Sequence, residues 1–261
     1  KLSSVKNIIA ISSAKGGVGK STITSNIAVT LKEMGFKVGI LDADIYGPSM
    51  HIMFDLVGRK PLAVDINGES KMKPIESFGI KILSIGFFTK MDQAVIWRGP
   101  MATKALNQLI FDADWGEIDF LLIDLPPGTG DIQLTLGQQI AMHAAVIVTT
   151  PQDISYIDVE KGIQLFDQLH VPVIAVVENM THFSCESCGH KHELFGSGAS
   201  KKLVEQYGFN RVLALPLIPQ VAQACDRGKP FVLDNPDHAY SKVLAESVSI
   251  LMQDAADLQA S

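Results

Sequence analysis

The chain has 261 residues, of which 47% are hydrophobic and 19% charged, and its formal net charge is −6 at pH 7. This length allows a large buried core, in one large domain or two small ones. The acidic balance argues against sequence-independent binding of nucleic acid, and no apolar run approaches the roughly 18–20 residues that a membrane-spanning helix needs.

Short apolar runs alternate with helical patterns along the chain, which is typical of βα units and a mainly parallel sheet. The runs are nearly continuous, as expected of strands buried on both faces. Strands are predicted at 7–13, 37–44, 80–86, 119–125, 144–150, 171–179 and 211–217. Helices are predicted at 20–34, 99–113, 132–142, 154–169, 198–208 and 238–258. The Gly-, Pro- and charge-rich stretch 58–74 is predicted to be a surface excursion or hairpin.

Three cysteines do not make a disulfide framework, and the first residues lack the hydrophobic segment of a secretory signal. We therefore expect a reducing compartment. This would be the cytoplasm, or an organelle stroma or matrix if a transit peptide was removed. The chain opens on Lys1 rather than Met, which fits removal of an upstream segment.

The stretch AKGGVGKST (14–22) follows the first predicted strand and opens a helix, which is the context of a P-loop. Backbone N–H groups of such a loop point at phosphate oxygens, Lys20 supplies charge for the β- and γ-phosphates, and Ser21 can ligate Mg²⁺. Ala14 replaces the first glycine of the strict pattern, so it must avoid a positive φ. The predicted nucleotide-binding residues here are Gly16, Gly17, Val18, Gly19, Lys20, Ser21 and Thr22.

Two acidic stretches, LDAD (41–44) and LLIDLPPGTGD (121–131), end predicted strands. Because ligands of open α/β sheets bind at the carboxyl ends of the strands, we expect both stretches to converge on the P-loop. Asp124 is typical of a Walker-B acid that holds Mg²⁺ through water, and the N–H of Gly128 is expected to sense the γ-phosphate. A turn or helix cap is the alternative for a strand-end Asp.

The stretch HFSCESCGHKHELFG (182–196) carries Cys185 and Cys188 at C-x-x-C spacing. A zinc ribbon normally needs a second C-x-x-C or a distant His pair, and a redox dithiol lies at a helix N-terminus early in a βαβ unit; the sequence favours neither. Two chains related by a two-fold axis would bring four thiolates together, a set suited to a [4Fe–4S] cluster or to zinc.

The remaining metal-ligand residue types are weaker candidates. A local site made with histidines leaves little chain to wrap a metal, and loop histidines are more often solvated than ligating. Cys225 is predicted to be an ordinary buried cysteine. The histidines concerned are His182, His190 and His192.

KGGVGKST, with Lys15 ahead of the glycines, resembles the deviant Walker A motif of the MinD/ParA/nitrogenase-iron-protein superfamily. Over residues 5–235 the chain resembles the Mrp/ApbC (Nbp35-like) family of P-loop ATPases that carry iron–sulfur clusters. The resemblance implies an α/β P-loop NTPase three-layer sandwich with a mainly parallel central sheet. The other motifs that carry it are DADIYGPS (42–49), WRGPM (97–101), DLPPGTGDIQLTL (124–136), VTTPQ (148–152), VENM (177–180) and FGSG (195–198).

The resemblance also implies roles for single residues. Lys15 would reach the nucleotide of a partner subunit, so ATP hydrolysis would depend on the homodimer. Slow hydrolysis is also expected. Asp44 would orient the attacking water, and Asp42 would support the Mg²⁺ shell. Asn179 would hydrogen-bond the adenine edge, with a simple turn Asn as the alternative. Trp97 and Arg98 match the family motif without an assigned role.

The function expected from this resemblance is an ATPase that holds a [4Fe–4S] cluster at Cys185 and Cys188 of a homodimer and transfers it to apo iron–sulfur proteins. No nucleic-acid or membrane partner is expected, and 1–261 is expected to be a single P-loop ATPase domain. Many family members carry a further small domain before the ATPase, which is absent from this sequence.

Three other functions compete with this one. The first is a MinD/ParA-type positioning ATPase, but the acidic tail 234–261 lacks the basic character that membrane or DNA binding needs. The second is a reductase like the nitrogenase iron protein, whose cysteines belong at other points of the chain. The third is a dimeric ATPase with a structural zinc site made of four cysteines.

Overall fold

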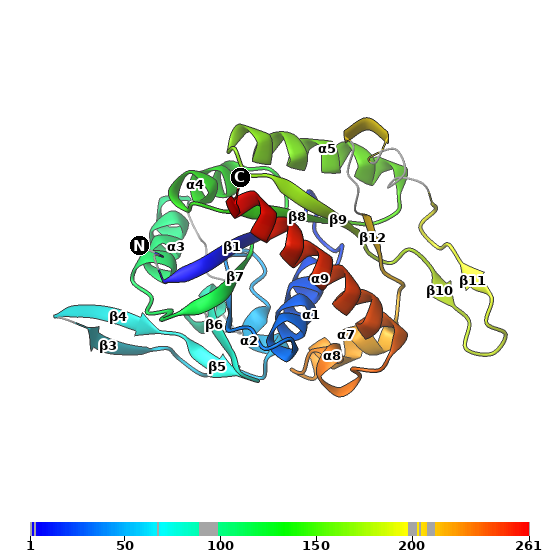
Figure 1. Ribbon diagram of the computed structural model, residues 1–261. Helices are drawn as coiled ribbons and strands as arrows, with labels where there is room; N and C mark the ends of the chain where they lie inside the picture. The colour runs from blue at the N-terminus through cyan, green and yellow to red at the C-terminus, as the bar shows by residue number, and fades with distance from the viewer. Residues whose placement is uncertain are drawn as a thin grey trace.

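The computed structural model describes residues 2, 4–66, 68–88, 99–197, 203, 205–207 and 212–260. An eight-stranded sheet, in the order β12-β9-β8-β1-β7-β2-β6-β5, forms its centre (Figure 1). Its neighbouring strands are parallel except for β5, which runs antiparallel to β6. The strands are β1 (Val5–Ser12), β2 (Val38–Asp42), β5 (Ile75–Ser77), β6 (Ile80–Ser84), β7 (Ile118–Asp124), β8 (Ala144–Thr149), β9 (Val173–Glu178) and β12 (Val212–Ala214).

Helices cover both faces of the sheet, because successive side chains of its strands point alternately to the two faces. In β1, Ile9 and Ile11 pack with one group of helices, and Ile8 and Ala10 pack with the other. The first group is α1 (Lys20–Glu33), α2 (Met50–Met53), α7 (Pro219–Asp226), α8 (Phe231–Asp234) and α9 (Ala239–Ala260). The second is α3 (Gly99–Phe111), α4 (Asp131–Gln139) and α5 (Asp153–Gln168). This arrangement confirms the predicted α/β fold with a mainly parallel central sheet.

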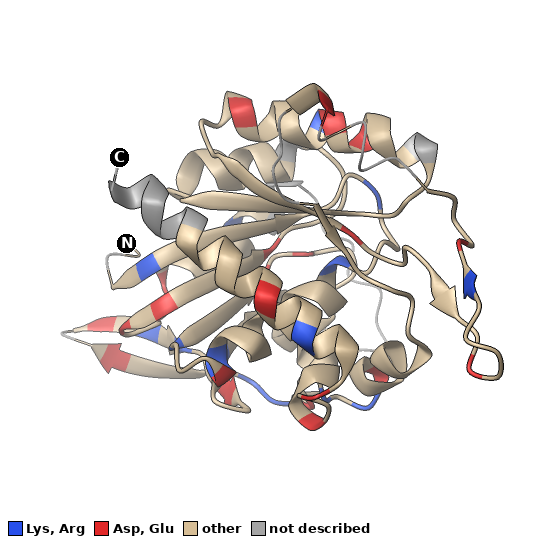
Figure 2. Cartoon of the chain, turned by 45° about the vertical axis from the view of Figure 1, so that its right-hand side comes forward, with Lys and Arg blue, Asp and Glu red and all other residues tan. Residues whose placement is uncertain are grey.

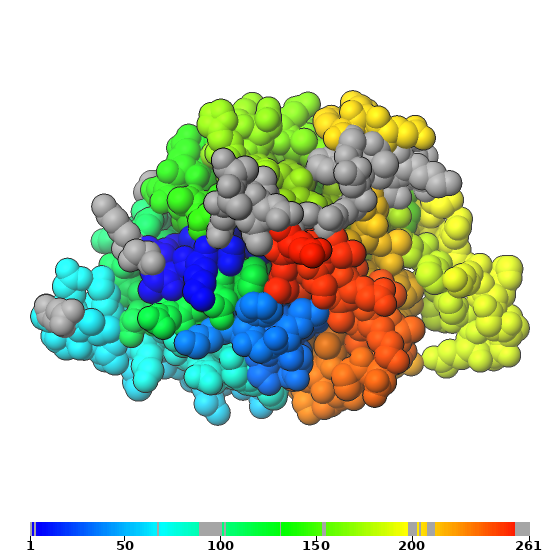
Figure 3. All heavy atoms as spheres, viewed as in Figure 1, coloured from blue at the N-terminus to red at the C-terminus, as the bar shows by residue number. Residues whose placement is uncertain are grey.

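Two small antiparallel hairpins stand at opposite ends of the molecule (Figures 1 and 3). The hairpin of β3 (Leu62–Ile66) and β4 (Glu69–Lys73) confirms the hairpin interpretation of 58–74. The hairpin of β10 (Phe183–Ser184) and β11 (Lys191–His192) carries the C-x-x-C pair. We call this second segment, residues 183–192, the cysteine hairpin.

Some elements differ from the sequence-based expectation. The short helices α2, α7 and α8 and the 3₁₀ helix η1 (Ile85–Phe88) have no predicted counterpart, because four to eight residues are too few to show a hydrophobic period. Of the helix predicted at 198–208, residues 203 and 205–207 are described, and they are helical. No helix in the described ranges is long and apolar enough to cross a bilayer.

Both edges of the central sheet are very short strands. β5 and β12 contain three residues each. The carboxyl ends of β1, β2, β7 and β9 lie between these edges, and the P-loop, both acidic stretches and Asn179 follow directly from them. The fold therefore gathers the predicted nucleotide residues at one margin of the sheet.

Candidate functional site

The P-loop residues adopt the backbone that their sequence predicts. Gly17 and Gly19 have φ values of 80° and 84°, in the left-handed region that glycine tolerates. Ala14 is not among the described residues with positive φ, as its side chain requires. α1 begins at Lys20, directly after Gly19. The unpaired N–H groups of this first helical turn therefore follow the loop, an arrangement that favours anions.

Lys20 is buried against carboxylates. Its ammonium nitrogen lies 2.9 Å from Asp124 Oδ1 and 3.8 Å from Asp44 Oδ2. The other Asp124 oxygen accepts a hydrogen bond of 2.6 Å from Ser21, and Thr24 donates one of 2.8 Å to Oδ1. Lys20 and Asp124 are 6% and 0% exposed, so a phosphate that binds Lys20 must compete with a strong internal ion pair.

Asp42 makes structural contacts that the sequence did not indicate. It is fully buried and opposite Asp124 in the β2–β7 pairing. Its Oδ2 accepts hydrogen bonds from the backbone N–H groups of Ser49 and Met50, both at 3.0 Å, and from the hydroxyl of Ser84 at 2.8 Å. Burial, and then the nearby charge of Asp124, raise the pKa of Asp42 to about 7. Asp42 thus holds the start of α2 at the site.

The loop after β7 is tied to the P-loop strand. The N–H of Gly128, whose φ is 99°, donates to the carbonyl of Ser13 at 2.8 Å. In this state the amide expected to sense the γ-phosphate is already used by the protein. Contact with a phosphate would require this loop to leave Ser13.

Lys15 is held within its own chain by neutral acceptors. Its ammonium lies 2.8 Å from Gln152 Oε1 and 2.5 Å from Ser155 Oγ. The hydroxyl of Thr150 lies 3.2 Å from Ser155 Oγ, which extends the network. Gln152 is the last residue of the VTTPQ motif, but the sequence gives no indication of Ser155, because it lies 140 positions from Lys15.

Asn179 follows the end of β9 and contacts the P-loop. Its side-chain nitrogen donates to the Val18 carbonyl at 2.9 Å. A Cβ added to Gly19 would clash with the same nitrogen, so a larger residue at position 19 would require the Asn179 side chain to shift. The structure thus brings Asn179 to the phosphate loop, and its contact with adenine stays a prediction.

The cysteine hairpin closes a tight turn around its thiols. The backbone N–H of Cys185 donates to His190 O at 2.9 Å, and Gly189 N–H donates to Cys185 O at 2.8 Å, with Gly189 in the left-handed region. The backbone N–H groups of Cys188 and then Ser187 hydrogen-bond to the Cys185 thiol and lower its pKa. A lowered thiol pKa favours the thiolate, which is the form that binds metals.

The histidines of this region do not complete a metal site with the cysteines. Within the described part of the chain, no group of three or more His, Cys, Asp or Glu side chains is placed to hold a metal ion. The rings of His190 and His192 lie edge to face at 4.8 Å, and His182 Nδ1 lies 3.1 Å from the Thr181 hydroxyl. One chain therefore supplies the thiols of Cys185 and Cys188 alone, with no third ligand among these described residues.

Two other predictions concern residues outside this site. Cys225 is 4% exposed, which confirms it as a buried cysteine, and burial raises its pKa. Trp97 and Arg98 lie outside the described residues.

Comparison with known proteins identifies the family. The family model described as the NUBPL iron-transfer P-loop NTPase, of the ParA group, matches residues 4–252. The chain belongs to this family. An iron–sulfur cluster carrier protein of Aquifex aeolicus is 44% identical over 254 residues, which are 97% of this chain and 69% of that protein. The NUBPL iron–sulfur cluster transfer protein of Dictyostelium discoideum is 43% identical over 91% of this chain and 73% of its own length.

Solved structures share the fold of this chain. A nucleotide-binding protein of Archaeoglobus fulgidus in complex with ADP has a TM-score of 0.77 and 37% identity, over 87% of this chain and 88% of that one. The cell division ATPase MinD of Pyrococcus furiosus has a TM-score of 0.66 at 19% identity, over 95% and 98% of the two chains, and shows a shared fold. The chain spans only 65% of the length of the Escherichia coli iron–sulfur cluster carrier protein, at 46% identity.

Proposed function

We propose that this NUBPL-family chain is an ATP-hydrolysing carrier that holds a [4Fe–4S] cluster between two copies of itself and transfers it to apo iron–sulfur proteins. The observation that carries the proposal is the cysteine hairpin, which offers two thiols and, within the described residues, no third ligand. A cubane cluster takes four cysteine thiolates. Two chains related by a two-fold axis supply that number.

Exposure of the hairpin supports transfer rather than storage. Cys188 is exposed and Cys185 is partly exposed, and the hairpin projects beyond the body of the molecule (Figure 3). A cluster between two such hairpins is open to the cysteines of an acceptor protein. Ligand exchange can then proceed one thiolate at a time.

The nucleotide site fits ATP with Mg²⁺. Ser21 Oγ and the Asp124 carboxylate, 2.6 Å apart, offer the hard oxygen ligands that Mg²⁺ prefers, and Asp42 lies beside them in the sheet. Bound Mg²⁺ supplies charge that stabilises the phosphates. Lys20 exchanges Asp124 for the β- and γ-phosphates, and Asp44, 3.8 Å from Lys20, orients the attacking water.

Hydrolysis depends on the dimer, because Lys15 of one copy stabilises the charge on the nucleotide of the other. Binding of ATP and assembly of the four-cysteine site are then linked through the same association. Figure 2 shows basic and acidic residues interspersed over the elements rather than gathered on one of them. No nucleic-acid or membrane partner is proposed.

Anaerobic reconstitution with iron and sulfide tests the carrier function. We expect one [4Fe–4S] cluster per two chains, a dimer by size exclusion, and transfer to an apo-ferredoxin. Cys185→Ala/Cys188→Ala should abolish all three, whereas Cys225→Ala, which changes the buried cysteine, should retain them. A transferable cluster on the double variant would contradict the proposal. Tight zinc at four thiolates with no cluster would identify a structural zinc site instead.

A further inference from the structure

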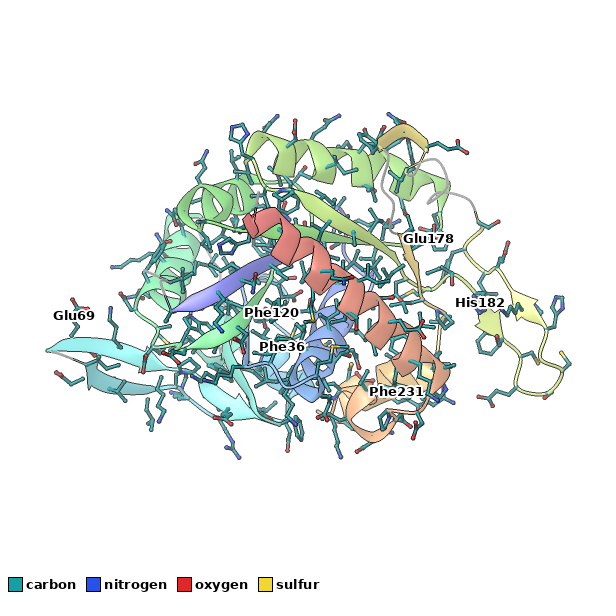
Figure 4. The ribbon with its side chains drawn as sticks, viewed as in Figure 1. Phe36, Glu69, Phe120, Glu178, His182 and Phe231 are labelled. Atoms are coloured by element: carbon teal, nitrogen blue, oxygen red, sulfur yellow. The ribbon has the colours of Figure 1, made fainter. Side chains whose placement is uncertain are left out.

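A short segment joins the P-loop to the cysteine hairpin. Asn179, which donates to the Val18 carbonyl at 2.9 Å, is six positions before Cys185. The segment leaves the sheet at the end of β9 and enters β10 at Phe183. Figure 4 labels Glu178 and His182, which mark its two ends, with the hairpin beyond His182.

Met180, the second residue of this segment, has a strained backbone. Its φ is +61°, in the left-handed region, which is costly for a residue that has a Cβ. Its side chain reaches back to the P-loop, where Cε lies 3.7 Å from the position of a Cβ built on Gly19. Asn179 Nδ2 lies closer still to the same position. Both residues therefore pack directly on Gly19.

Beyond Met180 the segment is fixed to the sheet. The N–H of Thr181 donates to the Leu215 carbonyl at 2.9 Å, and its hydroxyl donates to the same oxygen at 3.1 Å. The N–H of Leu217 donates to the His182 carbonyl at 2.8 Å. Residues 181–182 are thus an extension of the ladder between β9 and β12, and they hold the stem of the hairpin.

Met180 lies between residues that contact the P-loop and residues that are hydrogen-bonded to the segment that follows β12. Lys20 has to leave Asp124 to bind a phosphate, and any shift of the adjoining loop that accompanies this change would be felt at Gly19. Asn179 and Met180 contact that loop, whereas the backbone N–H of Thr181 is hydrogen-bonded to the carbonyl of Leu215. Backbone rotation at Met180 is the simplest way to accommodate the difference.

We propose that Met180 is a positioning residue whose left-handed backbone transmits reorganisation of the P-loop to the cysteine hairpin, so that nucleotide and metal affinities are coupled. This inference rests on the proposed function, because it treats Cys185 and Cys188 as the metal ligands. By thermodynamic linkage, the factor by which nucleotide changes the metal affinity equals the factor by which metal changes the nucleotide affinity.

The test measures Co²⁺ affinity by the thiolate-to-metal absorption of the full chain, with and without a non-hydrolysable ATP analogue and Mg²⁺. For the unmodified chain we expect the two affinities to differ by about fivefold or more. Met180→Gly keeps the left-handed backbone without its steric cost and removes the contact with Gly19. It should reduce the ratio to about one, while each affinity measured alone changes less than about twofold.

Met180→Leu is the matched control, because it keeps both the Cβ and a side chain of similar volume. It should retain the ratio of the unmodified chain. If Met180→Gly does not fold, Met180→Asn replaces it, since Asn also tolerates the left-handed region, and the same loss is expected. A normal ratio in Met180→Gly, or an equal loss in Met180→Leu, would overturn the proposal.

The outcomes separate this inference from the proposed function. If the unmodified chain binds nucleotide and Co²⁺ with no coupling, the role of Met180 is wrong and the carrier function stands. If Cys185→Ser/Cys188→Ser binds Co²⁺ as well as the unmodified chain does, the metal site itself is wrong, and both proposals fail.

Discussion

The ammonium nitrogen of Lys15 lies 2.5 Å from the hydroxyl oxygen of Ser155, in the same chain. Gln152 Oε1 is the second acceptor, at 2.8 Å, and neither acceptor is charged. Lys15 is therefore held by hydrogen bonds alone, which a nucleotide phosphate on a second chain can replace.

Ser155→Ala should raise ATP turnover several-fold at a fixed protein concentration. A hydrogen bond to a charged group contributes about 1.5–3 kcal/mol, and its loss makes Lys15 easier to release to a partner. Nucleotide affinity should not change. Lys15→Ala is the control: it should bind nucleotide normally and lose turnover. Turnover in Ser155→Ala at or below that of the unmodified chain would contradict an inhibitory contact.

Lys20→Ala should abolish nucleotide binding and destabilise the chain. It leaves Asp124, which is fully buried, without its counter-charge, and breaking such a pair costs about 3–5 kcal/mol. Adding Asp124→Asn to this variant should restore most of the free energy of unfolding but no nucleotide binding. Denaturant unfolding and a fluorescent nucleotide titration measure the two effects. Intact ATP hydrolysis in Lys20→Ala would refute the P-loop assignment.

The contribution of Asp42 to the stability of the nucleotide-free chain should be lost as the pH rises from about 4 to above 7. The pKa of Asp42 is raised by burial from 3.8 to about 7, so the folded state binds a proton that the unfolded state releases. Its contribution is complete below pH 3.8 and is lost as the pH passes about 7. The free energy of unfolding should fall less over this range in Asp42→Asn. Identical pH slopes in the two proteins would exclude this assignment.

Alanine at Gly19 should destabilise the nucleotide-free chain more than alanine at Gly17. Both glycines have φ values near the same left-handed angle, 84° and 80°, so both substitutions incur about 1–2 kcal/mol of backbone cost. A Cβ at Gly17 meets nothing within 4 Å, whereas a Cβ at Gly19 would clash with the side-chain nitrogen of Asn179. Equal losses of unfolding free energy would mean that Asn179 moves aside at no cost.

The sequence could predict that the proposed nucleotide residues lie together, because they have fixed positions relative to strand ends. Asp124 ends a continuous apolar strand. The carboxyl ends of parallel strands lie at one margin of the sheet, and Lys20 contacts Asp124 there. The contacts of Asp42 with Ser49, Met50 and Ser84 were not predictable, because they depend on how a four-residue helix is placed. A strand-end Asp gives no sign of which amides it will accept.

The cysteine hairpin shows a different limit. The C-x-x-C spacing was visible, but strands of two residues have no hydrophobic period from which to predict them. The left-handed Met180 was likewise hidden, since methionine carries none of the preference for positive φ that Gly and Asn show.

The two short strands at the margins of the central sheet restrict how copies of this chain can associate. β5 and β12 contain three residues each, so a neighbouring chain would find few N–H and C=O groups with which to continue the sheet. Edge-to-edge pairing would build open-ended filaments of sheets, a common route to aggregation. Short margins discourage that route and leave the proposed dimer to form through other surfaces of the chain.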